Sequence, residues 1–174
     1  MIKIDFFYLR IIYTIFYKKM TNWIQAKINT GRLITRLPST VQDMIKTEEK
    51  DQHMTLLYGC SDNDEYIMNV IHKYLPLKLK FGTIRTGDRV KEALFIGIED
   101  NEALTNLFWE LYNDDKINTD KIHGLIDGKF DPHLTIGYLY DGIQEREEVK
   151  KILGHKLIDF EVEVTFKDIE VLSE

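Results

Sequence analysis

Two motifs place a threonine two residues after a histidine: His53-Met54-Thr55-Leu56 and His133-Leu134-Thr135-Ile136. On a β-strand, residues i and i+2 point to the same face, so each motif would present an imidazole beside a hydroxyl. Two such strands around one groove suit phosphodiester cleavage, because one imidazole can take the proton of the attacking oxygen while the other protonates the leaving oxygen. The hydroxyls would hydrogen-bond the non-bridging oxygens, where charge develops. Histidine suits both tasks because its unperturbed pKa lies near neutral pH.

The pairing of the motifs is more specific than either motif alone. Two of the five histidines carry the pattern, and both open apolar strands. Each is followed ten residues later by a predicted helix, and 24 or 25 residues later by a further predicted strand. This repeated order predicts an internal repeat with a pseudo-two-fold relation. The alternative is that both histidines are ordinary strand residues with satisfied side chains.

From residue 20 onward the chain alternates predicted strands and helices, with no linker or low-complexity tract. Apolar residues at a period of two indicate strands, and those at three to four indicate helices. We expect strands over Trp23–Asn29, His53–Tyr58, Leu77–Thr83, Ala93–Ile98, His133–Tyr140 and Phe160–Phe166. We expect helices from Pro38 to about Glu48, over Asp62–Tyr74, over Glu102–Tyr112 and over about Ile143–Leu153.

The two motifs, 80 residues apart, resemble the signature of the 2H phosphoesterase superfamily. That superfamily includes 2′-5′ RNA ligases, cyclic phosphodiesterases and viral enzymes that degrade nucleotide signals. The resemblance covers residues 20–174 and implies a bilobal α+β fold, with two antiparallel sheets around a central cleft, helices outside and no metal. The segments QHMTLLYG and FDPHLTIGYLY look most similar to phage anti-CBASS phosphodiesterases, which destroy the cyclic oligonucleotides that bacteria make to signal infection.

The resemblance assigns roles to four residues by their motif positions. His53 and His133 would form the acid/base pair, with either one as the base, and Thr55 and Thr135 would hold the phosphate. A ribose 2′-hydroxyl would attack the neighbouring 3′-5′ phosphodiester of a cyclic di- or trinucleotide such as 3′,3′-cGAMP, without a cofactor. Two alternatives stay open: a 2′-5′ RNA ligase-like or 2′,3′-cyclic phosphodiesterase acting on RNA ends, and a non-catalytic protein that sequesters cyclic nucleotides.

Base recognition adds two further candidates. Nucleobases are commonly held by aromatic stacking, and Trp23 at the start of the first strand could stack on one. Packing in the core or at its rim is the alternative for this tryptophan. Glu161 lies in the last alternating strand and could accept a hydrogen bond from an adenine amino group. For Glu161 we favour the alternative, a solvated face of an edge strand.

Several further side chains are expected outside the site. Tyr58 and Tyr138 each lie five residues after a motif histidine, which on a regular strand is the opposite face. We therefore expect both rings to pack. A predicted hairpin turn at Gly87-Asp88 is flanked by Arg85, Arg89 and Lys91. We expect these cations to solvate that turn rather than to reach a substrate phosphate as part of a lid.

Composition limits the partners. The chain of 174 residues is 44% apolar with a net charge of −6, which fits a globular protein. Negative charge disfavours long nucleic acid, whose binding rests on many cationic contacts with phosphates. We therefore expect a small cyclic nucleotide substrate, no long nucleic acid, no membrane and no obligate protein partner. No histidine has metal-ligand spacing to other ligands. Cys60 is the single cysteine, so we expect no intramolecular disulfide and a cytoplasmic location, that of the host bacterium for a phage protein.

The first 19 residues differ from the rest. They are rich in Ile, Phe, Tyr and Lys, and their apolar run is interrupted by Arg10 and too short to span a bilayer. A small-residue cleavage site is also missing, which disfavours a signal peptide. We interpret residues 1–19 either as a disordered or loosely docked leader, or as translated upstream sequence with Met20 as the start, and favour the second. Residues 20–174 are then one bilobal domain.

Overall fold

The computed structural model describes residues 22–29, 33–86, 93–119, 129–140, 151–155 and 159–173. The interpretation of residues 1–19 and the hairpin turn predicted at residues 87–88 lie outside these ranges. Within the described residues, no helix is long and apolar enough to cross a membrane.

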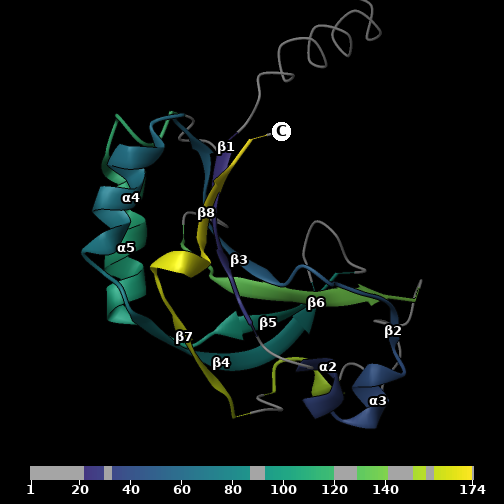
Figure 1. Ribbon diagram of the computed structural model, residues 1–174. Coiled ribbons are helices and arrows are strands. Elements are labelled where there is room, and N and C mark those ends of the chain that lie inside the picture. The colour runs from purple at the N-terminus through teal and green to yellow at the C-terminus, as the bar shows by residue number, and fades with distance from the viewer. Residues whose placement is uncertain are drawn as a thin grey trace, which may run out of the picture.

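The described strands form two antiparallel sheets (Figure 1). A three-stranded sheet has the order β3-β1-β8, with β3 at His53–Cys60, β1 at Asn22–Lys27 and β8 at Ile169–Leu172. A five-stranded sheet has the order β2-β6-β5-β4-β7, with bounds Ile45–Glu48, His133–Leu139, Ala93–Ile98, Leu77–Thr86 and Glu161–Val164 in that order. The protein is therefore an α+β fold with two antiparallel sheets, which confirms this part of the sequence prediction.

Two longer helices lie on one side of the three-stranded sheet (Figure 1). These are α4 (Asp64–His72) and α5 (Glu102–Asn113), and each begins after an asparagine whose side chain accepts a backbone N–H of the first turn. Such a cap satisfies a donor that has no partner inside the helix. Two short helices, α2 (Leu33–Arg36) and α3 (Ser39–Gln42), lie beside the five-stranded sheet, and a 3₁₀ turn, η2 (Phe166–Asp168), precedes β8.

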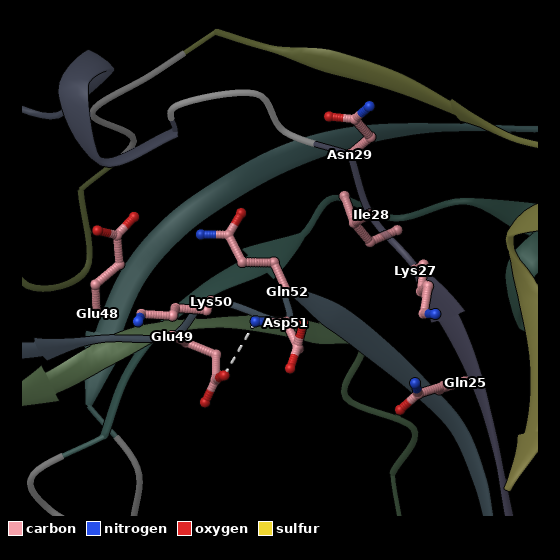
Figure 2. A pocket seen from close by; sticks show the side chains of 9 residues that line it. All are labelled: Gln25, Lys27, Ile28, Asn29, Glu48, Glu49, Lys50, Asp51 and Gln52. Carbon is pink, nitrogen blue, oxygen red and sulfur yellow. Dashed lines mark hydrogen bonds between the residues drawn. The ribbon is translucent and has the colours of Figure 1, made fainter.

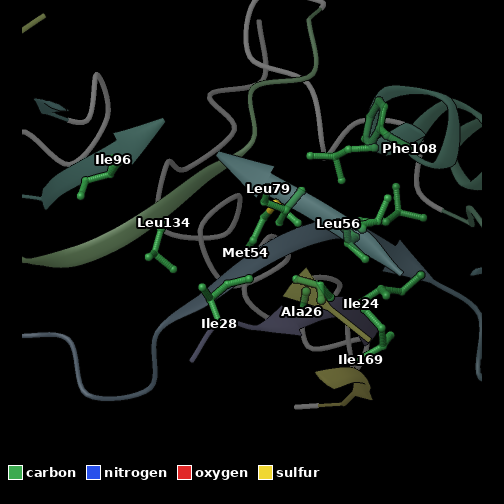
Figure 3. Close-up of a cluster of buried hydrophobic side chains, with 14 of the residues drawn as sticks. Ile24, Ala26, Ile28, Met54, Leu56, Leu79, Ile96, Phe108, Leu134 and Ile169 are labelled. Carbon is green, nitrogen blue, oxygen red and sulfur yellow. The ribbon is translucent and has the colours of Figure 1, made fainter. Parts of the chain in front are cut away.

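One apolar core joins the two sheets (Figure 3). The alternation along β1 and β3 directs their apolar side chains inward, where they meet those of β4, β5 and β6 and of α5. The labelled members include Ile24, Ala26, Met54, Leu56, Leu79, Ile96, Phe108 and Leu134. Along β3, β4 and β6, half-buried or exposed residues alternate with the buried ones over part of each strand, and these side chains face away from this core.

The two motif strands lie beside each other without pairing. Cα atoms of β3 and β6 come within 8 Å, although the strands belong to different sheets. A short connection holds them in this relation: Glu49, just after β2, donates its N–H to the carbonyl of Ile136 on β6 (3.2 Å). Gln52, just before β3, accepts the N–H of Ile28 after β1 (2.9 Å). The sheets therefore meet along the strands that carry the two histidines.

The helix predicted from Pro38 to about Glu48 is wrong in its second half. Only Ser39–Gln42 is helical, and Ile45–Glu48 is strand β2, paired with β6. The threonine and the β-branched isoleucine in IKTE fit a strand, and pairing to β6 satisfies their backbone groups, so tertiary pairing prevails over the apolar period. Of the helix predicted over about 143–153, residues 143–150 lie outside the described ranges, and residues 151–152 are helical.

Candidate active site

His53 and His133 open their strands in the same local geometry. Each side chain is half-buried, and each Nδ1 lies within hydrogen-bond distance of the carbonyl oxygen two residues earlier: 2.7 Å to Asp51 and 2.8 Å to Asp131. A carbonyl oxygen can only accept, so Nδ1 carries the hydrogen at both positions. The other ring nitrogen, Nε2, takes no part in this hydrogen bond. The sequence shows two histidines in equivalent motifs, and the structure gives both the same tautomer.

The strands that follow the two histidines bury their residues in the same order. Over seven positions, both β3 and β6 read half-buried, buried, half-buried, buried, buried, exposed, buried. Thr55 and Thr135 are the half-buried third residues, on the face of their own histidine, as the two-residue period requires. Each motif therefore offers an imidazole and a hydroxyl on one face, and an apolar pair on the other.

The two consecutive buried positions mark a β-bulge in each strand. The pairing of β1 with β3 skips Leu56, and the pairing of β5 with β6 skips Ile136, which is the same position of the motif. An extra residue in one strand shifts the alternation of every side chain beyond it. Both bulges therefore occur after the His-x-Thr motif and leave the motif itself regular.

The bulges correct the expectation that Tyr58 and Tyr138 pack on the opposite face. Tyr58 pairs with Trp23 and Tyr138 with Ala93, residues that share a face with the partners of the motif histidines and threonines. The two rings are accordingly 43% and 39% exposed. Sequence reasoning missed them because it assumed unbroken alternation. The tyrosine five residues after each motif histidine was the available signal, since it occurs in both motifs.

On the His53 side, the neighbouring strands supply a polar network. Lys27 is the cross-strand partner of His53, and its Nζ lies 2.6 Å from a carboxylate oxygen of Glu170 on β8. The other oxygen of Glu170 accepts from Gln25 Nε2 (3.3 Å), and Gln25 Oε1 accepts from Trp23 Nε1 (3.1 Å). The hydrogen bond from Lys27 lowers the pKa of the Glu170 carboxyl and raises that of the Lys27 ammonium. The predicted stacking residue Trp23 thus lies on the face of His53, and this network fixes the orientation of its indole.

On the His133 side, the neighbours are an aromatic ring and an arginine. Phe95, cross-strand partner of Thr135, tilts against the imidazole of His133 with ring centroids 4.4 Å apart. Arg85 pairs with Phe95 on the next strand, and its guanidinium binds the carboxylate of Asp131, whose carbonyl holds His133. Nε of Arg85 is buried without a hydrogen-bond partner among the described residues. The prediction that Arg85 only solvates a turn is therefore wrong, because strand β4 extends to Thr86 and Arg85 is paired with Asp131. Arg89 and Lys91 lie outside the described residues.

Glu161 lies apart from the two motifs. It is exposed on β7, the edge of the five-stranded sheet, and pairs with Lys80, whose Nζ is 4.0 Å from its carboxylate. Two strands separate β7 from β6, which corresponds to about 14 Å along the sheet. The structure therefore brings Trp23, but not Glu161, next to a motif strand; a role for Glu161 in reading a base stays a prediction.

A pocket of about 310 Å³ adjoins the His53 side (Figure 2). One wall comes from the end of β1 and the residues after it (25 and 27–29), and the other from the end of β2 and the segment that links it to β3 (48–52). Each wall contains a residue adjacent to His53: Lys27 is its cross-strand partner, and Gln52 precedes it in the chain.

Other reactive groups lie away from this face or are unsuited to chemistry. Cys60, at the end of β3, is buried, and burial raises the pKa of its thiol to about 11, which keeps it protonated. Among the described residues, no three His, Cys, Asp or Glu side chains gather in a group that could hold a metal ion. What the arrangement offers is proton transfer at two imidazoles, hydrogen bonds from two threonines, and cationic and aromatic side chains around them.

Comparison with known proteins leaves this geometry as the main guide to function. No protein-family model matches the chain, and no curated protein shows significant sequence similarity to it.

Proposed function

We propose that this chain is a metal-independent phosphodiesterase of the two-histidine class, with the bilobal 2H fold and its internal repeat. One observation carries the proposal: both His-x-Thr strands begin with an imidazole held at Nδ1 by the carbonyl two residues earlier, which leaves Nε2 available for proton transfer. A histidine with a purely structural role needs a hydrogen-bond partner at only one ring nitrogen, and either Nδ1 or Nε2 would serve. Two histidines with the same tautomer, the same bulge and the same burial order support a shared chemical role.

In the proposed mechanism, a ribose 2′-hydroxyl attacks the adjacent 3′-5′ phosphodiester. A bond forms between the 2′ oxygen and phosphorus as the bond from phosphorus to the 5′ oxygen breaks. Nε2 of one histidine accepts the proton of the 2′-hydroxyl, and Nε2 of the other, protonated beforehand, donates its proton to the 5′ oxygen. Thr55 and Thr135 hydrogen-bond the non-bridging oxygens, whose negative charge grows in the transition state.

The substrate we propose is a cyclic di- or trinucleotide immune signal such as 3′,3′-cGAMP, which a phage enzyme would destroy in the cytoplasm of its host to evade CBASS defence. The resemblance of the motif segments to anti-CBASS phosphodiesterases supports this choice. So does the net charge of −6, which disfavours a long polyanion but tolerates a ligand with two or three phosphates. Trp23, Tyr58 and Tyr138 supply aromatic faces on the motif side of the sheets, where bases would stack.

A 2′-5′ RNA ligase-like or 2′,3′-cyclic phosphodiesterase acting on RNA ends uses the same histidines but needs cations that track a backbone. On the described face of the five-stranded sheet, Lys80 and Arg85 are each opposed by a carboxylate, Glu161 and Asp131. This pairing favours the small cyclic substrate. Side-by-side turnover of 3′,3′-cGAMP and of an RNA ending in a 2′,3′-cyclic phosphate would rank the two.

The proposal is tested by incubating the protein with 3′,3′-cGAMP in excess EDTA and following linear products by chromatography. We expect turnover by the wild type and none by the His53→Ala/His133→Ala double variant. Turnover that survives the double substitution would refute the assignment of the histidines. Tight binding without product would instead identify a protein that sequesters cyclic nucleotides.

A further inference from the structure

The pocket beside His53 is lined by more acidic than basic side chains, which is unusual next to the proposed position of a scissile phosphate. Three carboxylates, those of Glu48, Glu49 and Asp51, line it together with the ammonium groups of Lys27 and Lys50 (Figure 2). One oxygen of Glu49 accepts the backbone N–H of Asp51 (3.2 Å), which shapes the wall. Acids outnumber bases here, so a second phosphate group would be repelled. A neutral ligand that donates hydrogen bonds is the better fit.

Among nucleotide parts, a base with adjacent donors meets this requirement. Guanine presents N1–H and the N2 amino group side by side, so a single carboxylate can accept from both at once. It also offers the acceptors O6 and N7, which lysine contacts in specific recognition. Adenine has one exocyclic amino group and no ring N–H on that edge, so a carboxylate can accept only one hydrogen bond from it. The charged walls therefore favour guanine over adenine.

The pocket is also connected to the chemistry. The backbone of Asp51 donates to Glu49 on the wall and accepts from Nδ1 of His53, at 2.7 Å. Lys27, on the other wall, pairs across the ladder with His53 and is held by Glu170. A base in this pocket would therefore contact the segment that holds Nδ1 of His53.

We propose that this pocket is a guanine subsite, which binds one base of a guanine-containing cyclic nucleotide beside His53. The proposal rests on the proposed function for the identity of the substrate, but the pocket can be tested by binding alone. The carboxylates of Glu48 and Asp51 are its recognition groups; both residues are exposed, so an amide in their place leaves the core intact.

The experiment measures binding to a protein that cannot turn over its ligand, His53→Ala/His133→Ala, by calorimetry with 3′,3′-c-di-GMP, 3′,3′-cGAMP and 3′,3′-c-di-AMP. We expect the two guanine-containing ligands to bind about tenfold more tightly than c-di-AMP, within the range for one bidentate base contact. Adding Glu48→Gln/Asp51→Asn should reduce this preference to about twofold or less, because an amide replaces one acceptor by a donor.

A matched control changes the same types of residue away from the pocket: Asp62→Asn/Glu163→Gln removes two charges from exposed positions and should leave the preference intact. Equal affinity for all three ligands, no binding of any of them, or a preference that survives the pocket substitutions would overturn the proposal. Turnover by the wild type in EDTA separates this result from the proposed function. Turnover without guanine preference refutes the subsite alone, and guanine preference without turnover supports the subsite and refutes the enzyme.

Discussion

The two halves that meet at β3 and β6 share a strand and differ in what surrounds it. In both halves the strand carries a half-buried histidine, then a half-buried threonine and, beyond a β-bulge, an exposed tyrosine. The partner strands do not match: the positions opposite the histidine and the threonine are Lys27 and Gln25 in one half, and Gly97 and Phe95 in the other. On the next strand out from the motif strand, the residue in line is Glu170 of β8 in the first half and Arg85 of β4 in the second.

This difference separates two requirements. In the proposed function, acid/base cleavage of one phosphodiester needs two proton-transfer groups in like geometry, and the residues proposed for this role are the ones the halves have in common. A ligand with two bases needs different contacts on its two sides, and the residues around the motifs differ accordingly. We therefore assign catalysis to what is shared and recognition to what differs, and the following predictions test that division.

The largest effect should come from the histidines, and it should be equal on both sides. We expect His53→Ala and His133→Ala each to lower kcat by about 10³-fold, within the range for general acid/base groups. The double variant should be little worse than either one, because residues that act as a unit are not additive. Steady-state kinetics with 3′,3′-cGAMP measure this. His72→Ala, in helix α4, is the matched control and should leave kcat unchanged.

Truncating a buried apolar side chain on either motif strand should also lower the stability of the protein by a similar amount. Leu56→Ala and Ile136→Ala remove fully buried side chains at equivalent positions, and each should lower the free energy of unfolding by about 2–5 kcal/mol. Chemical denaturation reads this directly. If one substitution costs several kcal/mol and the other nothing, the two strands do not share one core.

The threonines come next. Thr55→Val and Thr135→Val keep the branched shape but remove the hydroxyl, and each should lower kcat by about 10²-fold, as removal of one transition-state donor does. KM should change little, since the hydrogen bond strengthens as charge develops. A rise in KM at constant kcat would instead make the threonines ground-state ligands.

At Gly137 we expect a substitution to affect stability differently from one at the equivalent position of the other half. A Cβ on this residue would lie 2.6 Å from the carbonyl oxygen of Thr47 on β2, so Gly137→Ala should lower the free energy of unfolding by about 1–3 kcal/mol. The equivalent residue in the other half is Leu57 on β3, which among the described strands pairs only with β1 and tolerates a side chain there. Urea denaturation of Gly137→Ala tests this, and an unchanged midpoint would contradict the close approach of β2.

The smallest effect is a pH dependence confined to the His53 half. The pKa of Glu170 is lowered from 4.5 when folded, chiefly by the hydrogen bond from Lys27, so its contribution to stability is complete above pH 4.5. That contribution is lost as the pH falls through the lower folded value. Thermal unfolding between pH 6 and pH 3 should therefore show a shallower acid decline for Glu170→Gln than for the wild type, with pH points set on either side of that pKa. Identical slopes would show that the pair with Lys27 adds nothing.

The fold and the motif faces could be predicted because they depend on local patterns. The period of two in HMTL and HLTI predicts both the strand and the side that each residue faces, and the helical apolar periods locate α4 and α5. The predictions were wrong where pairing between segments far apart in the sequence determines the structure. The bulges that turn Tyr58 and Tyr138 toward the site are set by pairing with β1 and β5, and β2 is a strand because β6 lies beside it. Arg85 was missed for the same reason, since Asp131 is its partner only after β4 and β6 join one sheet.

The most direct test of the central claim is a crystal structure with a phosphorothioate analogue of 3′,3′-cGAMP that resists cleavage. We expect one phosphate flanked by both imidazoles, with Nε2 of His53 and Nε2 of His133 each within about 3.2 Å of an oxygen that gains or loses a proton. Thr55 and Thr135 should hydrogen-bond the non-bridging atoms of that same phosphate. Imidazoles separated by well over about 10 Å, or a phosphate bound by only one of them, would contradict acid/base catalysis by this pair.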